Sequence, residues 1–232
     1  MRYNVKTKIK AYWENNKRKI ILGIILTIFI FVFLFIRDAR HRPDRSTQVD
    51  NTPQPTLAVR EDMSGKNPVT LGSGTFTAGI DIPIGRYLAT TTENSFGSVV
   101  VYELGTSYPE ISEVLGNFSD TANVPSIALT LVQNQKIEIT GLNIVHFTPL
   151  QTELKTELTT GEWDVGLDIA PGTYTISSKD GLSGSVTILD GNNPVGYAKL
   201  GNNGTDDQQS AVVTLKQGQI IRISNIPTVV FQ

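Results

Sequence analysis

The chain carries one sequence pattern twice in its C-terminal part, and this duplication constrains the fold more than any other feature. The run from Gly74 to Tyr87 reads GTFTAGIDIPIGRY, and the run from Gly161 to Tyr174 reads GEWDVGLDIAPGTY. Further matches in the same order pair Gly97, Leu115, Leu131, Ile139 and Phe147 with Gly184, Leu200, Leu215, Ile223 and Phe231. Because this period exceeds that of solenoid repeats, it predicts two domains of about 75 residues, at 71–150 and 157–232, rather than a stacked array.

Each copy has the pattern of an all-β domain. Runs of β-branched, aromatic and alternating residues, separated by Gly, Asn, Pro and Ser, predict strands. In the first copy these runs are 74–78, 86–92, 98–104, 127–131, 136–140 and 144–148. In the second copy, 219–224 alternates as a half-buried strand does, and 189–193 (LDGNN) predicts a hairpin turn. We expect two tandem antiparallel β-sandwich or jelly-roll-like domains, each near the smallest size for an independent core.

The repeated motif predicts a structural turn. Pro171 presets φ at one position and Gly172 supplies a positive φ at the next, which is the pattern of a type II turn. Upstream, Asp168 is placed to accept backbone N–H bonds, and Tyr174 begins the next strand with its hydroxyl on a backbone acceptor. The corresponding residues of the first copy are Asp81, Gly85 and Tyr87. Calcium binding by the two aspartates would need further acids in a D-x-D-x-D-G spacing, which is absent, so we expect no metal.

The pattern G-x-D-I-x-x-G-x-Y followed by G-S-V resembles a repeat of poorly characterised secreted and membrane-anchored proteins of Gram-positive bacteria. In those proteins an element G-x-D-I-A-P-G-T-Y opens a small β domain. The resemblance covers roughly residues 72–232; the first copy departs from it at Pro83-Ile84, and many actinobacterial members carry cysteines that this chain lacks. The resemblance implies a small extracytoplasmic β domain and no particular activity.

An uncharged apolar run of seventeen residues extends from Ile20 to Ile36. As a helix it spans roughly 26 Å, close to the ~30 Å hydrocarbon core of a bilayer. No small-x-small cleavage site follows it, which favours an uncleaved signal-anchor over a signal peptide. We predict a transmembrane helix at 20–36, a basic tail at 1–19 and a polar, proline-containing disordered stalk at 37–70.

Basic residues flank the apolar run unequally, with seven Lys and Arg before it and four in 37–45. The positive-inside rule then places the N-terminus in the cytoplasm and the C-terminal domains outside the cell. In the tail, Val5, Ile9, Tyr12 and Trp13 share one helical face, which suits an amphipathic segment on the membrane surface; a short, partly ordered tail is the alternative. The residues expected at the membrane interface are Tyr12, Trp13, Lys17, Arg18 and Lys19.

Charge and cysteine content limit the kinds of partner that the protein can bind and indicate its cellular compartment. Residues 70–232 hold seven Lys and Arg against sixteen Asp and Glu, a net charge of −9, which repels phosphate backbones and argues against nucleic acid. The chain has no cysteine, so no disulfide supports the exported part. Exported domains without cysteine are common in Gram-positive bacteria, and we expect this protein at the surface of such a cell.

Catalytic constellations are not apparent in the sequence. The chain has two histidines, His41 in the predicted stalk and His146 in the last strand of the first copy. A serine nucleophile needs a histidine base and an orienting acid, and zinc needs clustered ligands that this spacing does not supply. No glycine-rich phosphate loop precedes a helix. We expect no enzyme activity, no cofactor and no catalytic residue.

Two binding functions are favoured over a third function, a hydrolase that would need His146 or a carboxylate pair in a pocket. Trp163 aligns with Phe76, so an aromatic residue belongs in both copies and is expected in the core rather than beneath a sugar; loops such as 201–207 are candidates for recognition. The favoured function is a membrane-tethered, non-catalytic interaction module that engages another exported or membrane protein through its tandem domains. The alternative is a binder of cell-wall polymer or surface glycan, which predicts exposed aromatic rings on one face.

Overall fold

The computed structural model describes Met63 and residues 66–116, 123–202 and 206–232. Within these residues the structure is all-β with two sheets, which confirms the predicted fold class at this level. The predicted tail at 1–19, the helix at 20–36 and most of the stalk at 37–70 lie outside the described residues. In the described part of the chain, no helix is long and apolar enough to cross a membrane.

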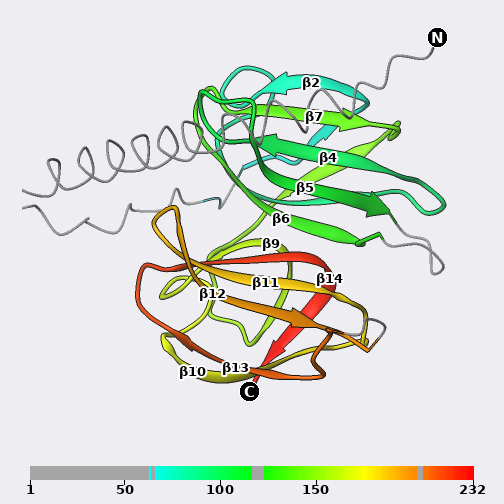
Figure 1. Cartoon of the computed structure of the whole chain (residues 1–232). Helices are drawn as coiled ribbons and strands as arrows, with labels where there is room; N and C mark the ends of the chain where they lie inside the picture. Colours follow the sequence, from blue (N-terminus) through cyan, green and yellow to red (C-terminus); the bar gives the residue numbers. More distant parts are fainter. Residues whose placement is uncertain (1–62, 64–65, 117–122, 203–205) are drawn as a thin grey trace, which may run out of the picture. The chain divides into compact units, whose positions relative to one another are not determined.

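The first repeat consists of eight strands in two layers (Figure 1). They are β1 (Val69–Leu71), β2 (Gly74–Thr77), β3 (Gly85–Thr91), β4 (Phe96–Tyr102), β5 (Pro109–Gly116), β6 (Ser126–Leu131), β7 (Lys136–Thr140) and β8 (Val145–Pro149). One layer has the order β1-β8-β3-β6 and the other β2-β7-β4-β5, with antiparallel pairing throughout. Both layers contribute to one buried core, as Tyr87 of β3, Val99 of β4 and Ile137 of β7 show.

The second repeat builds the same arrangement from six strands. They are β9 (Glu157–Asp164), β10 (Gly172–Ser178), β11 (Gly184–Asp190), β12 (Asn193–Leu200), β13 (Ala211–Leu215) and β14 (Ile220–Phe231). In sequence, β9 takes the places of β1 and β2, and β14 those of β7 and β8. The β9–β14 ladder is interrupted between Ile223 and Thr228, and on either side of this point β14 pairs with β11 and with β10. These two strands therefore pass from one layer to the other around the second core.

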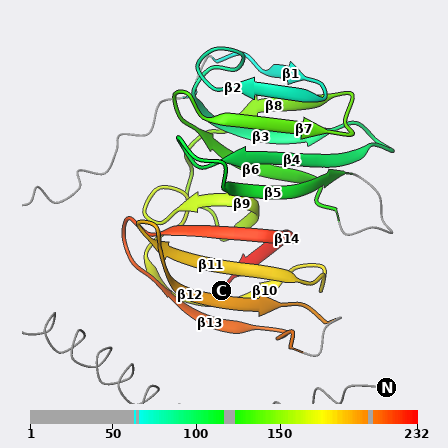
Figure 2. The ribbon, with the colours of Figure 1, turned by 45° about the horizontal axis from the view of Figure 1, so that its top comes forward.

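A parallel contact between β6 and β9 joins the repeats, so that one ten-stranded sheet runs through both (Figure 2). Ala128 lies opposite Gly161 at this contact. Gly161 has a φ of +121°, and a Cβ at this position would overlap the backbone of Ala128. Glycine therefore allows the two strands to approach, because it has neither the side chain nor the conformational penalty of other residues.

The predicted strands of the first copy correspond to β2, β3, β4, β6, β7 and β8, with ends displaced by at most two residues. The turn predicted at 189–193 joins β11 to β12, with Asp190 opposite Asn193. The stalk prediction extended too far, because β1 begins at Val69. Strand β5 was missed: its buried side chains alternate correctly, but Glu113 stands on the inward face between Ile111 and Leu115 and obscures the apolar pattern.

Candidate functional site

The aspartates of the repeated motif lie in equivalent turns. In the first repeat, Asp81 Oδ2 accepts a hydrogen bond from the backbone N–H of Thr77 at 2.7 Å. In the second, Asp168 Oδ2 accepts one from the backbone N–H of Asp164 at 2.8 Å. Both carboxylates thus bind the amide four residues upstream, a local contact that side chains of this length commonly make in turns.

The glycine that reverses the chain is not the one that the motif suggested. Gly172 is the first residue of β10, opposite Leu215, and it lacks a positive φ, so the predicted type II turn at this position is wrong. The reversal occurs earlier, at Gly79 and Gly166, with φ values of +85° and +97°. Gly85, the counterpart of Gly172, has a φ of +137° at the start of β3. The aspartate stabilises the turn that precedes the Pro171-Gly172 pair. The pair itself therefore forms no turn and joins that turn to β10.

The two motif tyrosines hold the start of β3 and β10 to the preceding turn. The hydroxyl of Tyr87 donates to the carbonyl oxygen of Pro83 at 3.0 Å, and that of Tyr174 donates to the carbonyl oxygen of Ala170 at 2.8 Å. Each ring packs edge-to-face on a phenylalanine of its own repeat. Tyr87 is fully buried, whereas Tyr174 is partly exposed. The motif therefore fixes a turn to a strand in both repeats.

In the second repeat only, the motif also forms the junction between repeats. The Asp168 carboxylate pairs with the guanidinium of Arg86, with Nη2 and Oδ2 3.0 Å apart and both side chains 1% exposed. Arg86 also donates to the Glu162 carbonyl oxygen at 3.1 Å and to Thr130 Oγ1 at 2.9 Å. Its guanidinium lies 4.8 Å from the ring centre of Trp163. Contacts of this kind, removed from water, fix the relative position of the two groups that make them.

A second buried contact crosses the junction at Glu113, whose side chain is 4% exposed. It accepts a hydrogen bond from the backbone N–H of Asn225 at 3.1 Å. Burial raises the pKa of Glu113 to about 7, and the bonds from Asn225 and Ser224 offset this only in part. The carboxylate thus lies where its charged form is disfavoured.

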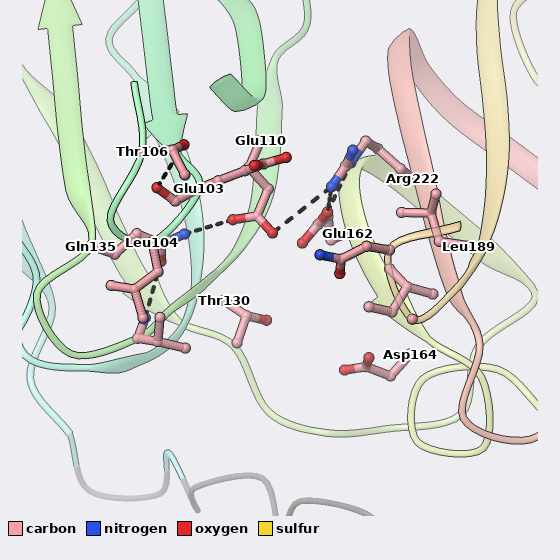
Figure 3. Close-up of a pocket in the computed structure, with 14 residues that line it drawn as sticks. Glu103, Leu104, Thr106, Glu110, Thr130, Gln135, Glu162, Asp164, Leu189 and Arg222 are labelled. Carbon is pink, nitrogen blue, oxygen red and sulfur yellow. Dashed lines mark hydrogen bonds and ion pairs between the residues drawn. The ribbon is translucent and has the colours of Figure 1, made fainter. Parts of the chain in front are cut away.

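A cavity of about 500 Å³ lies beside these contacts, with residues of both repeats in its wall (Figure 3). The first repeat contributes Glu103, Leu104, Thr106, Glu110, Thr130, Val132 and Gln135, and the second contributes Glu162, Asp164, Leu189, Gly191, Asn192, Ile220 and Arg222. This volume falls within the range of small-molecule pockets. The wall includes four carboxylates and one guanidinium, so the cavity is negatively charged.

Arg222 sits between two of these carboxylates. Its Nε donates to Glu162 Oε1 at 2.8 Å, and its Nη2 lies 3.9 Å from Glu110 Oε1. Figure 3 shows Glu110 between this arginine and Gln135, whose Nε2 donates to Glu110 Oε2 at 2.6 Å. Burial, followed by the charge of Glu162, raises the pKa of Glu110. One arginine therefore interacts with two carboxylates, and the wall of the cavity has an excess of negative charge.

Exposed tyrosines lie close to this cavity. Tyr197 of β12 is 68% exposed; it pairs with Thr187, which in turn pairs with Arg222. Cross-strand partners point to the same face of a sheet, so the Tyr197 side chain lies two strands, or roughly 10 Å, from Arg222 on that face. Tyr108 is also exposed and is the last residue of the β4–β5 loop, which lines the cavity.

Other residues singled out from the sequence lie apart from the cavity or inside the protein. Trp163 is buried and donates from Nε1 to the Thr159 carbonyl oxygen at 2.7 Å, as expected of a core aromatic. His146 is exposed on β8, with Nδ1 3.1 Å from Thr70 Oγ1. Among the described residues, no group of three or more His, Cys, Asp or Glu side chains could hold a metal ion.

The loop at 201–207 is only partly described, because 203–205 lie outside the described residues. At its end the buried Asp207 carboxylate accepts a short hydrogen bond of 2.5 Å from Ser183 Oγ and lies 3.1 Å from Lys199 Nζ. These contacts attach the loop to β12 and to the residue that precedes β11. The predicted membrane-interface residues Tyr12, Trp13, Lys17, Arg18 and Lys19 lie outside the described part of the chain.

Sequence reasoning missed the residues that matter most at the junction: Arg86, Glu113 and Arg222. A signal for them exists in the alignment of the two copies, which places Thr173 opposite Arg86, Ala198 opposite Glu113 and Glu138 opposite Arg222. Where two copies of one fold differ in charge, the difference marks a surface that only one copy uses. No family model, curated protein or solved structure matches the chain.

Proposed function

We propose that this protein is a membrane-anchored extracytoplasmic interaction module without catalytic activity, built from two small β-sandwich repeats that bind another exported or membrane protein. The anchor is the apolar segment 20–36, and the resemblance to Gram-positive surface repeats supports a cell-surface location. The observation that carries the proposal is the cavity between the repeats, because its wall needs both copies and the buried junction fixes its geometry.

The charge of the wall indicates the kind of partner segment. Glu103, Glu110, Glu162 and Asp164 outnumber the single cation Arg222. A partly enclosed site with excess negative charge attracts cations, because its low-dielectric walls focus the field. We therefore expect a segment of the partner with exposed Lys or Arg side chains to enter the cavity.

The test is a titration of the full-length chain, in mild detergent, with a fluorescent lysine- and glycine-containing peptide and with its glutamate counterpart. We expect saturable binding of the lysine peptide only, weakened at least tenfold in the double variant Glu110→Gln/Asp164→Asn. The matched control, Glu93→Gln/Asp180→Asn, removes the same charge from exposed positions and should bind normally. Equal loss in both double variants would show general charge attraction and would overturn the cavity as the site.

The exposed Tyr197 and Tyr108 support a second candidate function, the binding of a cell-wall polymer or glycan, because sugars stack on exposed aromatic rings. Co-sedimentation of the full-length chain with purified cell-wall sacculi, at low and moderate salt, tests it. Saturable binding that survives moderate salt and disappears in Tyr197→Ala would favour this candidate. Absence of binding leaves the protein partner as the function.

A further inference from the structure

Glu113 differs from Asp168, the other buried carboxylate at the junction, in the partners that it has. Asp168 pairs with the Arg86 guanidinium, whereas the groups that bond Glu113 are the neutral Asn225 amide and the Ser224 side chain. A buried carboxylate without a cation costs free energy when ionised and very little when protonated. Its protonation state is therefore coupled to the closure of the surface that buries it.

The second repeat shows that the fold does not need a carboxyl group here. Glu113 lies opposite Val99 on the inward face of β5, and its counterpart Ala198 lies opposite Val186 on the inward face of β12. Ala198 is part of the core of the second repeat. The edge of the first repeat thus carries a glutamate where the same architecture accepts alanine, and it is there that Asn225 of the other repeat docks.

The ionisable groups of the surrounding strands are engaged elsewhere. On β4, Tyr102 donates to Glu138; on β5, Glu110 accepts from Gln135; and between β9 and β14, Glu162 accepts from Arg222. None of these described side chains shifts the pKa of Glu113, which burial alone raises. Since the folded pKa lies above the ordinary value, the closed junction is favoured at low pH and weakens as the pH rises through about 7.

We propose that Glu113, buried at the junction where the Asn225 backbone N–H of the second repeat bonds to it, is a proton-dependent latch between the two repeats: the protonated side chain closes the junction, and its ionisation loosens it. The latch itself does not depend on what the cavity binds. Its consequence for ligand binding rests on the proposed function, because loosening the junction moves the two walls of the cavity relative to each other.

The latch is measured without ligand, by hydrogen–deuterium exchange of the full-length chain in mild detergent at pH 5.5 and pH 8.0, corrected for the intrinsic pH dependence of exchange. The reporting peptides cover 109–116 and 220–226, on the two sides of the junction. We expect the opening equilibrium of these segments to rise roughly tenfold to thirtyfold from pH 5.5 to pH 8.0. Peptides from β10 and β13, away from the junction, should change less than about twofold.

The variant Glu113→Gln keeps the acceptor for Asn225 but cannot ionise, and it should show no such rise. Glu113→Ala, which introduces the residue that the second repeat has at this position, should also be insensitive to pH and serves if the glutamine variant does not fold. Glu93→Gln removes an exposed carboxylate and should behave as the wild type does. A wild-type protein without the pH effect, or a Glu113→Gln variant that retains it, overturns the proposal.

Failure of the latch and failure of the proposed function are distinguishable. Exchange reports the junction in the absence of peptide, whereas the peptide titration reports the cavity. A normal pH response of exchange without peptide binding would retain the latch and reject the cavity as a cation-binding site. Peptide binding that is equal in wild type and Glu113→Gln at both pH values, with the exchange response intact, would show that the latch does not regulate binding.

Discussion

At the scale of single residues, equivalent positions in the two repeats differ in burial and in the groups that they contact. Arg86 is buried under the second repeat, whereas its counterpart Thr173 is exposed and bonds to Thr214 on the neighbouring strand. Likewise Asp168 is buried against Arg86, whereas its counterpart Asp81 lies in an exposed turn. The local hydrogen bond of the aspartate is common to both repeats; the ion pair belongs to the junction alone.

Replacing Arg86 by threonine, the residue of the second repeat, should destabilise the protein strongly. The variant Arg86→Thr leaves the Asp168 carboxylate buried without its cation, which typically costs about 3–5 kcal/mol. The free energy of unfolding is measured by titration with guanidinium chloride, with tryptophan fluorescence as the probe. In this variant Trp163 also loses the guanidinium above its ring, so its emission maximum should shift.

Asp81→Asn provides the matched control, because it changes the same motif residue at a place where no guanidinium of the described residues pairs with it. It keeps an acceptor for the Thr77 amide and should cost less than about 1 kcal/mol. The double variant Arg86→Thr/Asp168→Asn, which removes both charges, should recover part of the lost stability. An Arg86→Thr protein as stable as Asp81→Asn would mean that the ion pair does not hold the repeats together.

At the scale of elements, the second repeat fuses strands that the first keeps separate, and β9 thereby reaches β6. Gly161 of β9 lies opposite Ala128 of β6, and the backbones of the two residues approach closely there. Its counterpart Gly74 also has a positive φ, but the atoms nearest to a Cβ there belong to the ring of Phe76. The same glycine of the motif is therefore a local feature in one repeat and an inter-repeat contact in the other.

Gly161→Ala should cost more than about 2 kcal/mol, because a Cβ at this position overlaps the backbone of Ala128 and because the φ of +121° strains an alanine. Gly172→Ala is the control, since Gly172 has no positive φ and a Cβ there would lie 3.3 Å from the Tyr174 ring. It should cost under about 1 kcal/mol. Thermal unfolding of both variants measures the difference, and equal melting temperatures would contradict the close approach of β6 and β9.

At the scale of the whole described structure, the two repeats follow each other in the chain and also share buried contacts. Each has its own hydrophobic cluster, yet Ala128 of the first repeat belongs to the cluster of the second. The junction buries Trp163, which belongs to the core of the second repeat, together with the charged side chains of Asp168 and Arg86. We therefore expect the first repeat to shield the motif of the second repeat from water and so to contribute to the stability of the second repeat.

A chain consisting of 150–232 alone should accordingly be less stable than the same residues in the full-length protein. Without the first repeat, Trp163 and Asp168 become accessible to water, and the Trp163 emission should shift to longer wavelength. Fluorescence and circular dichroism of the separate repeat and of the full-length chain measure both effects. Unchanged emission and an unchanged melting temperature would show that the junction contributes nothing to the second repeat.

The sequence alone predicted the all-β class and most strands, because these depend on neighbouring residues. Comparing the two copies predicted the duplication and the aromatic position shared by Phe76 and Trp163. Alternation and turn chemistry depend on neighbouring residues, so they are visible in the sequence. Only the folded structure reveals that Gly172 lies in a strand, and that Arg86, Glu113 and Arg222 meet groups of the other repeat. These contacts join residues tens of positions apart, and burial and charge pairing between distant residues leave no periodic signal in either copy.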